Sequence, residues 1–184
     1  MTRLPLVAPA SAAPDSRLLL DQIQAAFGAT PNMFRAVAHS PAALQAMWGF
    51  FGALSRGVLP PKLGEQIAVA VADRNACEYC LAAHTALGRK AGASADEMRH
   101  AQAGESADPK TQAALRFALQ LVEGRGQVRE ADVAALRAAG FSEQEQVEIL
   151  AHVALNLFTN YVNVAFAVPV DFPAVPLGRA RRAG

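Results

Sequence analysis

The chain has 184 residues, of which 52% are hydrophobic and 18% charged, with 17 basic and 16 acidic side chains and a formal net charge of +1. This length fits one domain, which buries roughly 70% of the surface that its unfolded chain exposes. Nucleic-acid binding is excluded as a function class because the basic residues form no long cluster. The densest run, Arg179, Arg181 and Arg182, is expected to be a solvated tail.

The N-terminal segment does not fit a signal peptide. Pro5 and Pro9 interrupt its apolar run before the run reaches the length of a signal-peptide core. We interpret the segment as an extended arm. The expected organisation is an arm over 1–14, a single all-α domain over 15–170 and a tail over 171–184.

From the arm onward, nearly every apolar segment has the helical period and is bounded by helix start or stop signals. No alternating run predicts a β-hairpin, so the fold class is expected to be all-α. The helices expected before the double proline at positions 60 and 61 are one capped by Asp15 and stopped by Gly28, a short one over 32–38, and one opened by Ser40 and Pro41 that ends near Gly57.

The second part of the chain carries further start signals. In a capping box, a serine and a glutamate three residues later satisfy each other's free amide groups. Two such boxes occur, Ser94 with Glu97 and Ser142 with Glu145. The other expected helices are an apolar one after Pro61, one over CEYCLAAHTALGRKAG stopped by Gly92, one begun by Asp108 and Pro109, and a short one over 130–139.

The stretch from Ile149 to Val170 carries no charged residue and is long enough to be a membrane span. It does not fit one, because four polar residues recur at helical spacing and form a stripe: His152, Asn156, Asn160 and Asn163. A buried helix with a hydrogen-bonded or functional face is expected instead. The stripe fits a purely structural role and the lining of an active pocket equally well.

The chemically informative segment reads E-x11-C-x-x-C-x3-H and runs from Glu65 to His84. Two cysteines this close indicate redox chemistry or metal binding rather than a secreted disulfide framework. Cys77 and Cys80 fall on one face at the start of a helix, and His84 follows one turn later, where it can relay a thiol proton. Antiparallel packing of the preceding helix would bring the Glu65 carboxylate back to this cluster.

Two other interpretations of the cluster remain open. The cysteines could be incidental core residues, since free cysteine is among the most buried residue types. The two thiolates, the imidazole and the carboxylate could also supply four zinc ligands. Outside the cluster, His39 and His100 are expected on the surface, and Trp48 with Met47, Phe50 and Phe51 is expected in the core or at a subunit interface.

The segment GEQIAVAVADRNACEYCLAAHT, residues 64–85, resembles the core motif of the alkylhydroperoxidase D and carboxymuconolactone decarboxylase-like family. The later segment FTNYVNVAFAVPVDFP is similar to the end of the peroxidase-related branch. The resemblance implies a compact multi-helix fold and a homo-oligomer, commonly trimeric or hexameric. It also implies Cys80 as the peroxide-attacking nucleophile, Cys77 as the resolving thiol, Glu65 as the base and His84 as the proton relay.

The chain departs from the well-known alkylhydroperoxidases at one position. They place a second histidine between the cysteines, where this chain has Tyr79, whose phenol has a much higher pKa. A helix N-terminus should also favour the thiolate at Cys77 over Cys80, against the order implied by the family. The decarboxylases proper lack the cysteine pair, so the pair favours thiol redox chemistry.

The resulting hypothesis is a cytoplasmic, antioxidant, thiol-dependent peroxidase-like oxidoreductase that reduces hydroperoxides through a Cys77 and Cys80 dithiol cycle. No motif for a nicotinamide, flavin or haem cofactor occurs, so electrons are expected from an unidentified dithiol reductant protein. Neither a nucleic acid nor a membrane is expected as a partner. The alternatives are a cofactor-free lyase or small-molecule-binding protein of the decarboxylase type, and an oligomer without turnover.

Overall fold

A computed structural model describes residues 2–178, and within this range the chain forms nine α-helices and one short 3-10 helix without a β-strand. The all-α class predicted from the sequence is therefore confirmed. The elements in chain order are η1 (Pro9–Ser11), α1 (Pro14–Phe27), α2 (Asn32–Val37), α3 (Pro41–Leu54), α4 (Pro61–Arg74), α5 (Glu78–Lys90), α6 (Ala95–Ala103), α7 (Pro109–Glu123), α8 (Glu130–Ala138) and α9 (Glu143–Phe166).

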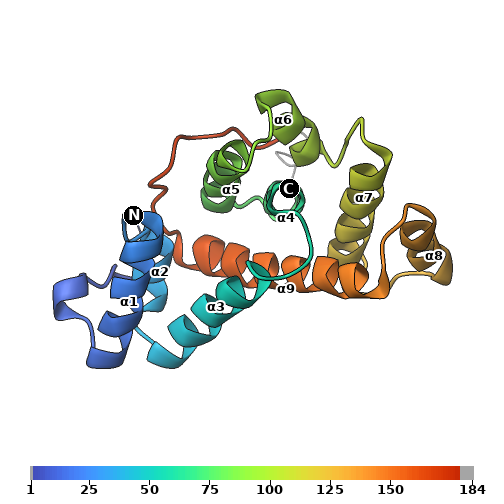
Figure 1. Cartoon of the computed structure of the whole chain (residues 1–184). Coiled ribbons are helices and arrows are strands. Elements are labelled where there is room, and N and C mark those ends of the chain that lie inside the picture. The colour runs from blue at the N-terminus through green and yellow to red at the C-terminus, as the bar shows by residue number, and fades with distance from the viewer. Residues whose placement is uncertain (1, 179–184) are drawn as a thin grey trace.

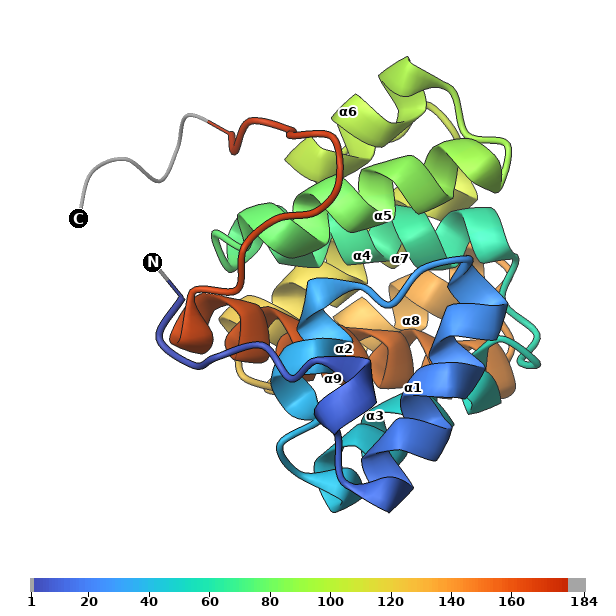
Figure 2. The ribbon, with the colours of Figure 1, turned by 90° about the vertical axis from the view of Figure 1, so that its left-hand side faces the viewer.

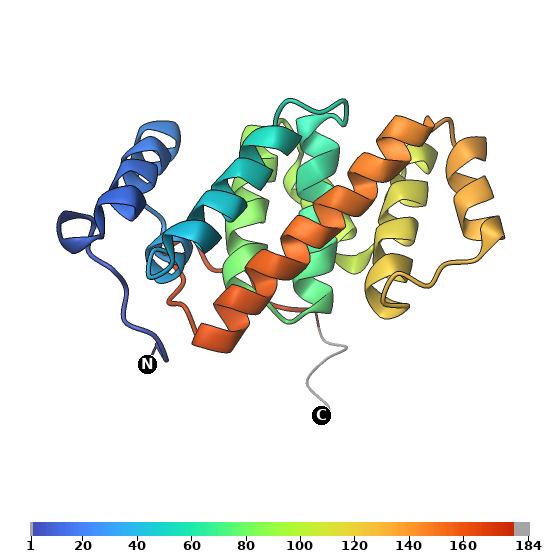
Figure 3. The ribbon, with the colours of Figure 1, turned by 90° about the horizontal axis from the view of Figure 1, so that it is seen from below.

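Helix α4 lies at the centre of the fold and packs against α5, α6, α7 and α9 (Figure 1). Its residues from Leu63 to Ala72 are almost all buried, as expected for a helix that is apolar on every side. Helix α9 runs obliquely across one face of the molecule, with α1 to α3 towards one end and α7 and α8 at the other (Figure 3). The α4, α5 and α9 helices therefore meet in the middle, where the cysteines lie.

Local capping chemistry determines most helix starts. Four of the five predicted side-chain caps accept a hydrogen bond from an amide of the first turn: Ser40, Ser94, Asp108 and Ser142. The expectation that Asp15 caps α1 is wrong. The helix begins one residue earlier at Pro14, which has no amide hydrogen to satisfy at the first helical position. Asp15 instead lies in the first turn, where its charge favours the helix N-terminus.

The N-terminal arm lies along the end of α9 and contains the short helix η1, which the sequence did not predict. The amide of Arg3 donates to the carbonyl of Phe166 over 2.8 Å. The Arg3 guanidinium donates to the carbonyl of Ala165 over 2.9 Å. The arm thereby satisfies carbonyl groups that the C-terminal end of α9 leaves free.

After α9 the chain turns back across α5 towards α6 (Figure 2), and we call residues 168–178 the C-terminal strap. The Asp171 carboxylate accepts a hydrogen bond from the amide of Asn32 over 2.8 Å. At the other end of the strap, the Gly178 amide donates to Asp73 over 2.8 Å. Residues 179–184, which include the expected arginine-rich tail, lie outside the described residues.

Helix α9 is long and apolar enough to cross a membrane by length and composition, and nearly half of its most apolar window is buried inside the fold. Its polar stripe faces inward, with all three asparagines buried. Its opposite side, which we call the α9 outer face, exposes large apolar side chains: Val147, Leu150, Phe158, Tyr161 and Val164.

Candidate thiol site

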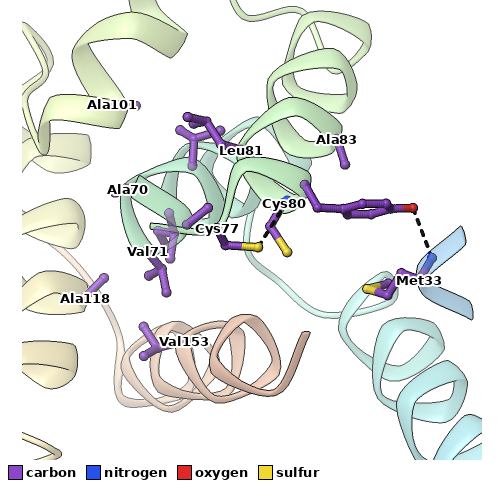
Figure 4. Packing of buried hydrophobic residues seen from close by; sticks show 14 of the residues in the cluster. Met33, Ala70, Val71, Cys77, Cys80, Leu81, Ala83, Ala101, Ala118 and Val153 are labelled. Atoms are coloured by element: carbon purple, nitrogen blue, oxygen red, sulfur yellow. Dashed lines mark hydrogen bonds between the residues drawn. The ribbon is translucent and has the colours of Figure 1, made fainter. Parts of the chain in front are cut away.

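The two cysteines lie at the junction of α4 and α5. A turn that contains Ala76 in the left-handed region, at φ 53°, separates the two helices. Cys77 then forms the N-cap of α5, and its Sγ accepts a hydrogen bond from the amide of Cys80 over 3.3 Å (Figure 4). Both thiols are free, and only 1% of Cys77 and 2% of Cys80 is exposed. The pair is thus reduced and shielded from bulk solvent.

The packing of α4 against α5 brings Glu65 to His84. The Nδ1 atom of His84 lies 2.7 Å from Oε2 of Glu65. This bond leaves Nε2 of the ring as the nitrogen available for a reacting group. Burial disfavours the charged imidazole, but the Glu65 carboxylate outweighs it, and the nearby Cys80 adds to the effect, so the pKa of His84 is raised.

The two thiols differ in acidity. Burial tends to raise the pKa of Cys80, but a hydrogen bond from Cys77, the charge of His84 and the amides of Asn163 and Asn160 lower it to about 6. The pKa of Cys77 is raised, first by that same hydrogen bond to Cys80 and then by burial. The thiolate is therefore favoured at Cys80, in contrast to what the position of Cys77 at the helix N-terminus suggested.

Tyr79 lies between the two cysteines in sequence, at the position where the well-known alkylhydroperoxidases have a second histidine, and its contacts are with α2 and the strap. Its hydroxyl accepts a hydrogen bond from the amide of Met33 over 3.2 Å (Figure 4). Its ring packs edge-on against Phe172 of the C-terminal strap, with 5.7 Å between ring centroids. Burial raises the pKa of Tyr79 further above its ordinary value. The phenol thus joins α5 to α2 and to the strap.

Helix α9 contributes polar groups that the sequence did not assign to the thiol. The Nδ2 atom of Asn163 donates to Sγ of Cys80 over 3.1 Å, and the Thr159 hydroxyl lies 4.0 Å from the same sulfur. The polar stripe was visible in the sequence as a set of polar residues at helical spacing within the uncharged stretch from Ile149 to Val170. Its target was not visible, because that depends on how α9 crosses α5.

Two cavities meet at His84. An apolar one of about 40 Å³ contains Cys80 and His84, and its other lining residues are Phe27, Pro31, Met33, Phe34, Phe51, Tyr79, Ala83, Leu87 and Phe172. A second cavity, of about 200 Å³, is lined by Glu65, His84 and His152 among other residues. The imidazole of His84 therefore separates an apolar side, where the thiol lies, from a side with further titratable groups.

A third hollow, of about 390 Å³, lies beside Cys77 between the start of α5 and the end of α9. Its lining includes Asn163 and residues of the strap such as Pro169. The site thus has separate openings next to its two sulfur atoms.

The remaining candidates behave as ordinary structural residues. His39 and His100 are exposed, as expected. Met47 is fully buried, and the half-buried Trp48 packs against Phe34 with 6.0 Å between ring centroids. For the zinc alternative, residues 2–178 contain no group of three or more histidine, cysteine, aspartate or glutamate side chains placed to hold a metal.

Part of the chain matches a known protein family, and solved structures share its fold. Residues 41–124 match the Carboxymuconolactone decarboxylase family. An alkylhydroperoxidase core structure, an uncharacterised peroxidase-related protein from Ralstonia eutropha JMP134, superposes with a TM-score of 0.83 at 29% identity, over 92% of each chain. The family match and this superposition together support a place in the alkylhydroperoxidase D-like and carboxymuconolactone decarboxylase family. No curated protein sequence matches it.

Other structures of the alkylhydroperoxidase D-like fold are also similar. A peroxidase-related protein from Silicibacter sp. TM1040 has a TM-score of 0.79 at 26% identity, over 91% of each chain. The debrominase Bmp8, in a cysteine-to-alanine variant bound to 2,3,4-tribromopyrrole, has a TM-score of 0.79 at 19% identity, with 93% of this chain and 92% of that chain covered. The same fold therefore occurs in proteins with different activities.

Proposed function

We propose that the protein is a thiol-dependent peroxidase-like oxidoreductase that reduces hydroperoxides through a dithiol and disulfide cycle of Cys80 and Cys77. The observation that carries this proposal is the buried Cys80 thiol, whose sulfur accepts a hydrogen bond from Asn163 and whose lowered pKa favours the thiolate. It lines one cavity with His84, which Glu65 holds in place. A nucleophile, a proton donor and an orienting carboxylate thus lie together at one site.

The reaction follows from this arrangement. The Cys80 thiolate attacks the terminal oxygen of the hydroperoxide, so that an S–O bond forms and the O–O bond breaks. Sulfur is oxidised by two electrons, and the peroxide leaves as an alkoxide that takes a proton from His84 and becomes an alcohol. Cys77 then attacks the Cys80 sulfur, the disulfide forms and the sulfenic oxygen leaves as water.

The disulfide has to be reduced before the next turnover. We assign this step to a dithiol reductant protein that exchanges with the disulfide through the hollow beside Cys77. A cytoplasmic location suits such a cycle, because thiol reductants are kept reduced there. The residues of the cycle supply the nucleophile and the proton path, so no further cofactor is assigned.

The apolar cavity bears on the alternative activities. A lyase that binds a carboxylated ring needs a cationic partner for the carboxylate. In the described chain the lining of this cavity contains no lysine or arginine, and its one histidine, His84, is already paired with Glu65. Its aromatic and aliphatic walls suit a hydroperoxide with an organic substituent. The lyase alternative predicts unchanged turnover of a carboxylated ring after both cysteines have been alkylated.

A second candidate is reductive dehalogenation of an aromatic ring. It is favoured by the aromatic lining next to Cys80 and by the fold shared with Bmp8. In that reaction the dithiol supplies two electrons, the ring exchanges halogen for hydrogen, and halide and a disulfide are the products. Release of bromide from 2,3,4-tribromopyrrole, without consumption of hydroperoxide, would favour this candidate.

The test is mass spectrometry of the reduced protein before and after one equivalent of tert-butyl hydroperoxide. We expect the loss of two hydrogen atoms across Cys77 and Cys80, and no peroxide consumption by Cys80→Ser. His84→Ala should slow peroxide consumption because it removes the proposed proton donor. His100→Ala, which changes an exposed histidine on α6, is its control and should leave the rate unchanged. Full activity of Cys80→Ser would contradict the assignment of the nucleophile.

We also propose that copies of the chain associate through the α9 outer face. Its large exposed apolar residues are separated by three positions, or by eight between Leu150 and Phe158, so they lie on one side of the helix, as in two helices that pack against each other. Among the described residues nothing covers this face in the single chain (Figure 3). A second copy offers the same apolar row, so pairing would remove both rows from water.

A further inference from the structure

Three buried asparagines follow one another along the inner face of α9. Asn156, Asn160 and Asn163 are between 0% and 4% exposed. Each has one amide atom without a hydrogen-bond partner among the described residues: Oδ1 of Asn156, Nδ2 of Asn160 and Oδ1 of Asn163. Buried amide atoms are rarely left unpaired, so three in a row on one helix need an explanation.

Asn163 contacts the sulfur of Cys80, and Asn160 precedes it on the same side of α9. Asn163 donates to it through Nδ2, which leaves Oδ1 of the same amide as a free acceptor next to the thiol. The orientation of Asn160 is fixed because its Oδ1 accepts a hydrogen bond from Nδ2 of Asn75 over 2.9 Å. Its own Nδ2 is therefore a free donor, on the same buried stripe of α9 as Asn163 and three residues before it.

Asn156 is different and serves as an internal comparison. Its Nδ2 donates to the carbonyl of His152 one turn earlier over 2.9 Å, and it makes no hydrogen bond to Cys80. It is equally buried and lies on the same helix. The hydrogen bond to the sulfur is therefore a property of Asn163 and does not follow from the stripe as a whole.

The free donor of Asn160 and the free acceptor of Asn163 complement the hydrogen-bonding groups of a sulfenic acid. The S–O–H group has an oxygen that accepts and a proton that it donates. A thiolate, by contrast, needs donors only, which Asn163 supplies through Nδ2. The two unpaired atoms are thus explained if the site is built for the oxidised sulfur as well as for the thiolate.

We propose that Asn163 and Asn160 form an amide cradle for Cys80, in which Asn163 Nδ2 donates to the thiolate and, after oxidation, Asn160 Nδ2 donates to the sulfenic oxygen while Asn163 Oδ1 accepts the sulfenic proton. The sulfenic part rests on the proposed function. The cradle takes the place of the absent histidine between the cysteines, since the hydroxyl of Tyr79 bonds to Met33 and away from the sulfurs. Hydrogen bonds to a charged sulfur are stronger than neutral ones.

The thiolate part is tested by the pH dependence of Cys80 alkylation with iodoacetamide in the full-length protein carrying Cys77→Ser. We expect Asn163→Leu to raise the pKa of Cys80 by about one unit. We expect Asn163→Asp, which keeps the shape but replaces the donor by a negative charge, to raise it further. Asn156→Leu should leave it unchanged. An Asn163→Leu protein with circular dichroism like the parent and an unchanged alkylation profile would overturn this part.

The sulfenic part is tested in the same background by adding tert-butyl hydroperoxide and trapping the sulfenic acid with dimedone after increasing delays. We expect Asn160→Leu to shorten the lifetime of the sulfenic acid several-fold and to increase the sulfinic product, relative to Asn156→Leu. Equal lifetimes in the two variants would overturn it.

These readouts separate the cradle from the proposed function. Alkylation needs no hydroperoxide, so the thiolate part is measured even if the protein reduces none. If Cys80 of the unmodified protein is not oxidised by hydroperoxide, the proposed function fails and the sulfenic part fails with it. If replacing Asn163 and Asn160 changes neither the rate at which Cys80 is oxidised nor the lifetime of its sulfenic acid, the proposed function stands and the cradle fails.

Discussion

The Nδ1 atom of His84 lies 2.7 Å from the Glu65 carboxylate, although the two residues belong to different helices. Because the carboxylate holds the imidazole and favours its charged form, the acidity of the neighbouring Cys80 thiol depends on a residue that does not touch the sulfur. Glu65 is therefore a positioning residue whose effect passes through His84.

The first prediction concerns this carboxylate. Glu65→Gln keeps a hydrogen-bonding side chain but removes the charge, so the pKa of His84 should fall and the pKa of Cys80 should rise. We expect kcat/KM for tert-butyl hydroperoxide to drop roughly 10- to 100-fold. The alkylation profile of Cys80 should shift to higher pH in parallel. A drop in activity with an unshifted profile would point to a role of Glu65 other than charge.

The second prediction concerns pH. The pKa of Cys80 is lowered from an ordinary value of 9.0 to about 6, so the thiolate fraction grows as the pH rises through about 6. The pKa of His84 is raised, so its proton is lost only above the ordinary histidine range. Peroxide reduction should therefore rise near pH 6, level off and fall once His84 deprotonates. Stopped-flow rates across the pH range measure both the rise and the fall. In His84→Ala the fall at high pH should be absent.

The third prediction compares two helical glycines. A Cβ atom at the buried Gly88 of α5 would lie 2.5 Å from Cε and Sδ of Met98 and 3.3 Å from Cβ of Glu65. Gly88→Ala should therefore destabilise the fold by about 1–3 kcal/mol and disturb Glu65. A Cβ at the exposed Gly49 of α3 would meet nothing within 4 Å. Gly49→Ala should stabilise by about 0.5–1 kcal/mol. Urea unfolding of both variants measures the change in the free energy of unfolding, which should fall for Gly88→Ala and rise for Gly49→Ala.

The fourth prediction concerns association. Tyr161→Glu places a charge in the middle of the α9 outer face, where the native side chain is 62% exposed. We expect it to convert the oligomer to the monomer in light scattering coupled to size exclusion. Leu18→Glu on α1, at a position that is 64% exposed, is the matched control and should leave the mass unchanged. A monomeric parent protein would refute the proposed interface.

Local chemistry explains which parts of the fold were predictable. Helix starts capped by Ser94 or Ser142 depend on residues three positions apart, and their capping boxes form as expected. The start of α1 was misassigned because Asp15 and Pro14 are both start signals, and the proline takes the first helical position. The position of the C-terminal strap was not predictable, because it depends on a pairing as distant as Asp171 with Asn32.

The thiol site divides in the same way. The spacing of Cys77, Cys80 and His84 places them together on one helix, and this part needs no tertiary information. The contact of Asn163 with the Cys80 sulfur requires the crossing of α9 over α5, which the sequence pattern does not contain. The periodic polar stripe indicated which side of α9 is important but not which atom it serves.

The hydrogen bond from the Cys80 amide to the Cys77 sulfur ties the backbone of α5 to the oxidation state of the protein. A sulfur shared in a disulfide is a weaker acceptor than the present one, so oxidation should release the first amides of the helix. Hydrogen exchange at the Cys80 amide would then be faster in the oxidised chain than in the reduced one. A reductant protein that binds the more mobile helix end would therefore select the disulfide form over the dithiol form before thiol–disulfide exchange begins.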